Sequence, residues 1–95
     1  MNVEFHPAAR EELRSARAWY EDRSPLSALG FAQEIDRAVQ QIGEAPTRYP
    51  RAEHGTRRVL LSRFPFTLFY RAGEAKTIVI AVAHQKRRPG YWSDR

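Results

Sequence analysis

The sequence predicts an α+β fold in which a short N-terminal strand and a helical hairpin pack on a small, twisted, mainly antiparallel sheet, in the order β-α-α-β-β-β. Two observations predict it. Apolar residues recur with a period of 3.6 in the first half of the chain and with a period of 2, or as a continuous run, in the second half. A length of 95 residues suffices for one hydrophobic core, so residues 1–95 are expected to form a single domain.

The first half of the chain predicts the strand and the hairpin. Residues 3–5 form a short extended segment, and Pro7 suits the first turn of a helix. The apolar stripe of this helix consists of Ala9, Leu13, Ala16, Trp19 and Tyr20. We expect the two aromatic rings to pack against the second helix. The acidic residues of the first helix are expected on its solvated face: Glu11, Glu12, Glu21 and Asp22.

The second helix begins at Ser24-Pro25, with the serine as cap and the proline at the first helical position. Gly43 and Pro46 are predicted to end it. Its apolar stripe consists of Phe31, Ile35, Ala38, Val39 and Ile42.

Three strands are predicted after residue 56. Residues 57–62 alternate in character, and Pro65 separates them from a second strand at 66–71. Residues 72–75 form a turn, and residues 77–83 are almost continuously apolar, which indicates a central strand buried on both faces. The segment after His84 is too basic, and too broken by proline and glycine, for a further strand.

Composition excludes several classes of function. The chain has no cysteine, which removes thiolate metal sites and disulfides and makes a reducing, cytoplasmic location the expectation. No apolar run approaches the ~20 residues that a membrane helix needs. Three scattered histidines without an acidic cluster make a poor metal site, and no phosphate-loop or dinucleotide motif is present, so we expect no metal and no cofactor.

The charge is distributed unevenly. The net charge of +5 divides into −3 for residues 1–47 and +8 for residues 48–95, and fourteen of the sixteen cationic residues are arginine. Arginine suits bidentate contacts with carboxylates and phosphates. A polyanion or an acidic protein is therefore the expected partner.

Eight residues of the basic half form the candidate site. In an antiparallel sheet they can gather at one end or on the open face: Arg57, Arg58, Arg63, His84, Lys86, Arg87, Arg88 and Tyr91. Such a group can cleave RNA without a metal, because histidine supplies a base, arginine stabilises the phosphorane and a further group protonates the leaving oxygen. The alternative interpretation is that a basic, aromatic tail only binds an anionic partner. Partner contacts are then expected from Arg57, Arg58, Arg87, Arg88 and Trp92.

An ordered set of short motifs runs along almost the whole chain. It includes Phe5-His6-Pro7, Trp19-Tyr20-Glu21, Ala45-Pro46, Arg57-Arg58, Phe64-Pro65-Phe66, Phe69-Tyr70-Arg71, Val82-Ala83-His84-Gln85 and Arg88-Pro89-Gly90-Tyr91-Trp92. This set resembles the RelE/ParE superfamily of bacterial toxins. The resemblance implies that the protein is the growth-inhibiting toxin of a type II toxin-antitoxin module, of the kind that stabilises plasmids. A cognate antitoxin is expected to wrap and silence the toxin.

The superfamily divides by target. RelE-like members cleave mRNA on the ribosome, and the resemblance places Arg57 or Arg58, Arg63, His84, Arg87 or Arg88 and Tyr91 in the regions of their catalytic residues. ParE-like members poison DNA gyrase without that set. The long helices, the 24–45 segment and the scarcity of lysine in the second half favour the ParE-like branch. The ribosome-dependent RNase and a non-toxic relative that only binds the antitoxin are the alternatives.

An acidic, amphipathic antitoxin segment is expected to cover the groove of the helical hairpin. Its carboxylates would then lie against Arg57, Arg58 and Arg88.

Overall fold

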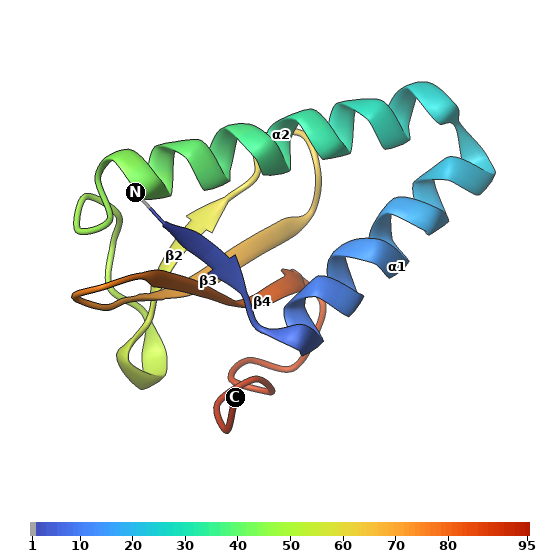
Figure 1. Ribbon diagram of the computed structural model, residues 1–95. Helices are drawn as coiled ribbons and strands as arrows, with labels where there is room; N and C mark the ends of the chain where they lie inside the picture. The colour runs from blue at the N-terminus through green and yellow to red at the C-terminus, as the bar shows by residue number, and fades with distance from the viewer. Residues whose placement is uncertain (1) are drawn as a thin grey trace.

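The computed structural model describes residues 2–95 and has the predicted α+β architecture. In chain order the elements are β1 (Val3–Phe5), α1 (Pro7–Arg23), α2 (Pro25–Glu44), the 3-10 turn η1 (Glu53–Gly55), β2 (Arg57–Leu60), β3 (Phe66–Ala72) and β4 (Thr77–His84). Both helices lie on one side of the sheet, and the C-terminal tail, residues 85–95, packs on the other side (Figure 1).

Side-chain caps fix where the two helices begin. The Ala8 backbone N–H donates to His6 Nδ1 at 3.0 Å, and the Ser27 N–H donates to Ser24 Oγ at 3.3 Å. A proline occupies the first position of each helix, where its missing N–H costs no helical bond. Helix α2 continues through Gly43 to Glu44 and ends directly before Ala45 and Pro46.

The sheet has the order β1-β4-β3-β2, so β4 is an inner strand as predicted. Strands β2, β3 and β4 are antiparallel, whereas β1 pairs with β4 in parallel, with Val3–Phe5 opposite Thr77–Val79. Strand β4 bulges, because Phe69 pairs with Ala81 while Tyr70 pairs with Val79, which leaves Ile80 as an extra residue.

The sheet separates two apolar clusters. The larger lies under the helices and includes Phe31, Ile35, Ile42, Leu68, Tyr70, Val79 and Val82. The smaller joins the tail to the sheet and consists of Ile80, Ala81 and Trp92, with Phe69, Ile78 and Tyr91 packed against them. The protein is therefore built in three layers.

The expectation that Trp19 packs in the core with Tyr20 is wrong. The Tyr20 ring contacts Phe31 and Phe64, at centroid distances of 5.3 and 5.0 Å, but Trp19 remains 52% exposed. Adjacent residues on a helix point about 100° apart. When Tyr20 faces α2, Trp19 therefore faces away from it, and the Arg23 guanidinium covers its ring at 3.6 Å.

A buried carboxylate shortens β2. Glu34 of α2 is 6% exposed and accepts hydrogen bonds from Ser62 N, Ser62 Oγ and Arg63 Nε, at 2.9, 3.3 and 2.7 Å. Because Ser62 bonds to α2, the strand ends at Leu60 rather than at Ser62. Burial by itself would raise the pKa of the Glu34 carboxyl, but the hydrogen bonds from Arg63 and Ser62 outweigh it and hold the pKa below its usual value.

We predict that Glu34→Gln lowers the free energy of unfolding at pH 7 by about 2 kcal/mol, because a neutral amide loses the charge-assisted bonds to Ser62 and Arg63. Because the folded-state pKa of Glu34 is lowered, this contribution is present at neutral pH and is lost as the pH falls through that pKa. Urea denaturation at pH 7 and pH 3 measures both effects. Asp36→Asn, an exposed position on the same helix, is the control. Equal urea midpoints for the two variants at pH 7 would contradict the role given to Glu34.

Candidate functional site

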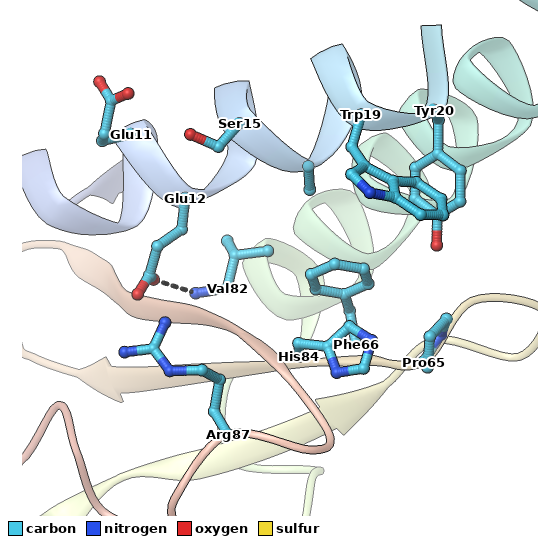
Figure 2. Close-up of a pocket in the computed structure, with 11 residues that line it drawn as sticks. Glu11, Glu12, Ser15, Trp19, Tyr20, Pro65, Phe66, Val82, His84 and Arg87 are labelled. Atoms are coloured by element: carbon cyan, nitrogen blue, oxygen red, sulfur yellow. Dashed lines mark hydrogen bonds between the residues drawn. The ribbon is translucent and has the colours of Figure 1, made fainter. Parts of the chain in front are cut away.

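A groove of about 510 Å³ lies between α1 and the end of the sheet. Figure 2 shows its walls: α1 on one side, and the ends of β4 and β3 with Arg87 on the other. Ala16, Trp19, Tyr20, Phe66 and Val82 make it largely apolar, and Glu11, Ser15, His84 and Arg87 add polar groups.

The groove follows the part of the β4 edge that no strand covers. Strand β1 pairs only with Thr77–Val79, so the edge from Ile80 onward would leave backbone polar groups without partners. Glu12 of α1 fills this place, since the Val82 N–H donates to Glu12 Oε1 at 3.0 Å (Figure 2). Arg95 Nη1 donates to the Ile80 carbonyl at 3.2 Å.

The same carboxylate anchors the C-terminal tail. Tyr91 Oη donates to Glu12 Oε2 at 2.7 Å, and Arg95 donates from Nη1 and Nη2 to the two carboxylate oxygens, both at 2.9 Å. Side chains that are 79 and 83 positions away in the sequence thereby meet on one group. We name this set, Glu12 with Val82, Tyr91 and Arg95, the Glu12 junction.

The expectation that Glu12 lies on the solvated face of α1 is therefore wrong. Glu12 is three residues after Ala9 and four before Ala16, both buried, so helical geometry places it on the face that meets the sheet. Glu11 behaves as expected, because it is exposed and pairs with Arg14 on the surface. The spacing from Ala9 and Ala16 is a signal that sequence reasoning could have used.

The junction shifts the acidity of its members. Burial raises the pKa of the Glu12 carboxyl, but hydrogen bonds from Arg95, Tyr91 and Val82 lower it by more, so the net shift is downward. Burial and the Glu12 charge both raise the pKa of the Tyr91 phenol. At neutral pH the Glu12 carboxylate is therefore ionised, and the Tyr91 hydroxyl remains protonated and donates a hydrogen bond to it.

Four of the predicted site residues come together. His84, Arg87, Arg88 and Tyr91 line a hollow of about 170 Å³ under the tail. His84 and Arg87 also line the apolar groove. His84 Nδ1 accepts from the Lys86 N–H at 3.0 Å, and the Arg87 guanidinium lies 3.8 Å from the centre of the Tyr91 ring.

The other predicted residues, Arg57, Arg58, Arg63 and Lys86, do not line this hollow. Arg57 pairs across the sheet with Tyr70 of the helix-side core, and its Nη1 donates to the Tyr49 carbonyl at 2.7 Å. Successive side chains of a strand alternate between faces, so Arg58 is on the tail side of the sheet, opposite Phe69. Arg63 is bonded to Glu34. The eight predicted residues thus do not line one common hollow.

Trp92 holds the tail in place. It is 1% exposed, and its ring lies 4.5 Å from that of Phe69 and 5.7 Å from that of His54. Arg71, which is part of a sequence motif but not a predicted site residue, adds bonds to the carbonyls of His54 and Arg95. A partner contact by Trp92 stays a prediction, and its side chain is covered in this structure.

Two kinds of site are not found among residues 2–95. No cluster of three or more His, Cys, Asp or Glu side chains is arranged to hold a metal ion. In the same stretch no helix combines the length and the apolar character needed to cross a membrane.

Comparison with known proteins gives a family and a fold. Residues 3–89 match the family model described as the ParE toxin of the type II toxin-antitoxin system parDE. The fold is similar to a solved structure of the chromosomal ParDE toxin-antitoxin system from P. aeruginosa, with a TM-score of 0.76 and 20% identity. The similarity covers 88% of this chain and 95% of that one. None of the curated protein sequences matches.

The Glu12 junction predicts that Glu12→Gln lowers the free energy of unfolding at pH 7 by about 2–3 kcal/mol, because Arg95 and Tyr91 lose a charged, partly buried acceptor. Glu11→Gln, one residue away and exposed, is the matched control and should change it by less than about 0.5 kcal/mol. Both variants are compared by urea denaturation.

The pH dependence gives a second measurement. The folded-state pKa of Glu12 is lowered, so its contribution is present at neutral pH and disappears as the pH falls through that pKa. The difference in free energy of unfolding between wild type and Glu12→Gln should therefore become smaller in acid. A difference that is absent at pH 7, or that is unchanged at pH 3, would show that the carboxylate does not hold the tail.

Proposed function

The chain belongs to the family of ParE toxins of type II toxin-antitoxin systems, and on that premise we propose that it arrests bacterial growth by acting on DNA gyrase until a cognate antitoxin neutralises it. Gyrase works on DNA in the cytoplasm, so the proposal also places the protein there. The observation that carries the choice of target is the match of residues 3–89 to the ParE model.

The geometry of the basic half supports this choice over RNA cleavage. Metal-free cleavage needs a base, cations and a proton donor around one phosphate. Here Arg57 and Arg58 are on opposite faces of the sheet and Arg63 is bonded to Glu34. The Tyr91 hydroxyl donates to Glu12, and its raised pKa weakens it further as an acid.

One observation keeps the ribosome-dependent RNase as the second candidate. His84, Arg87 and Arg88 line the same hollow, so one imidazole and two guanidinium groups can reach one ligand. Nδ1 of His84 accepts the Lys86 N–H, so the neutral imidazole carries its proton on Nε2 and offers a ligand in the hollow a hydrogen-bond donor. A relative that binds an antitoxin without being toxic would keep the groove and lack both activities.

The groove supports an antitoxin as the partner. It has an apolar floor, a half-exposed Trp19 in its wall and the Arg87 guanidinium at its rim. An amphipathic segment fills such a groove with its apolar side chains, and carboxylates on its polar side complement the rim.

The proposal predicts that the purified protein inhibits supercoiling by DNA gyrase and leaves mRNA on programmed ribosomes uncut. Expressed alone in bacteria, it should stop growth. Supercoiling is followed on agarose gels, and cleavage by primer extension on the same preparation.

His84→Ala distinguishes the two targets, with Lys76→Ala, an exposed residue between β3 and β4, as its control. Cleavage of mRNA at defined codons that is lost in His84→Ala and kept in Lys76→Ala would replace the gyrase proposal by the RNase. Normal growth with verified soluble protein, and neither activity in vitro, would leave only the antitoxin-binding relative.

A further inference from the structure

A second cationic hollow lies apart from the groove and the tail. It has a volume of about 420 Å³ and is formed where the chain turns back on itself before β2. We name it the Arg51–Arg57 hollow. Its lining consists of Thr47, Arg51, Ala52, Gly55, Thr56, Arg57 and Ala72.

Two like charges face each other in this hollow. Arg51 and Arg57 are partners in an isolated antiparallel bridge. The bridge is fixed on both sides, by the Ala52 N–H on the Thr56 carbonyl at 2.8 Å and by the Arg58 N–H on the Pro50 carbonyl at 3.1 Å. Directly opposite residues of an antiparallel pair have Cβ atoms about 5 Å apart, where like charges are destabilising.

No acidic side chain within residues 2–95 offsets this repulsion by an ion pair with either arginine, and none lines the hollow. Glu53 is close in sequence, but it lines the hollow under the tail instead. The two arginines thus line one hollow, and neither is paired with a carboxylate of the described residues.

The surrounding residues hold Arg57 in place. Its Nη1 donates to the Tyr49 carbonyl at 2.7 Å, and the Tyr49 hydroxyl donates to Gln41 of α2 at 2.9 Å. Arg48 Nη2 donates to the same hydroxyl at 3.1 Å. The guanidinium is therefore preorganised while several of its N–H donors remain for a ligand, which lowers the entropic cost of binding.

We propose that the Arg51–Arg57 hollow binds carboxylates of an acidic polypeptide segment. The proposal rests on the proposed function, in which an antitoxin is the partner, and gives that partner a contact separate from the groove. A polypeptide fits better than a nucleic acid, because a nucleic acid needs a continuous track of cations. The next arginine along β2, Arg58, is on the other face of the sheet, so the two arginines of the hollow are not continued by a third along this strand.

The test is an NMR titration of the ¹⁵N-labelled intact protein with a capped hexaglutamate peptide at low salt. Inorganic phosphate and a twelve-nucleotide single-stranded DNA serve as the other ligands. The peptide should shift the amide signals of Thr47, Gly55 and Thr56. Arg51→Gln should weaken its binding about tenfold, since a charge-assisted bidentate contact is lost.

Arg37→Gln, an exposed position on α2, removes the same charge elsewhere and should leave the affinity within about twofold. Arg51 is exposed at a surface turn, so its variant should fold, and the spectrum itself verifies this. Equal weakening by both variants would show a response to net charge only and would overturn the proposal. So would tighter binding of DNA or phosphate than of peptide at the same amides.

Gyrase inhibition separates this proposal from the proposed function. Peptide binding that depends on Arg51 in a protein that does not inhibit gyrase would refute the target and keep the hollow. Gyrase inhibition together with peptide binding that is insensitive to Arg51→Gln would support the target and refute the binding site in the hollow.

Discussion

The Glu12 carboxylate binds a strand edge that the sheet topology leaves without a neighbouring strand. Strand β4 is eight residues long and its parallel neighbour β1 is three, so most of one β4 edge has no strand beside it. Glu12 reaches this edge from α1, accepts the Val82 N–H and binds Tyr91 and Arg95 of the tail. The junction thus ties the tail to α1 and to the sheet, in addition to the packing of Trp92 on Phe69. Without it, the edge would be open for pairing with another chain.

The junction also explains how the positive charge is displayed. Tyr91 is fixed by Glu12, and Arg87 stacks on its ring, so the arginine stands between the apolar groove and the hollow under the tail. A partner in either place meets the same cation. The basic half of the chain is thus divided among separate surfaces, and the Arg51–Arg57 hollow is a third, independent one.

Sequence patterns predicted the elements better than the contacts between them. The helical stripes apart from Trp19, the Ser24 cap and the continuous apolar run of β4 reflect local patterns and were confirmed. The resemblance stated from ordered motifs was confirmed as well. The parallel pairing of β1, the burial of Trp92 and the joining of Glu12 to Tyr91 involve residues more than 70 positions apart or a tail without periodicity, where no local pattern operates. Sequence spacing alone could not show which of Arg57 and Arg58 is on the helix side of the sheet, because this depends on the register of β2 on β3.

Amide hydrogen exchange at Val82 tests the role of Glu12 most directly. Val82 lies beyond the part of β4 that β1 covers, and its N–H has the Glu12 carboxylate as its acceptor. The structure predicts strong protection of this amide at neutral pH, comparable to that of amides bonded between β3 and β4. Exchange as fast as that of an unprotected edge amide would contradict the junction, and with it the account of how the tail is held.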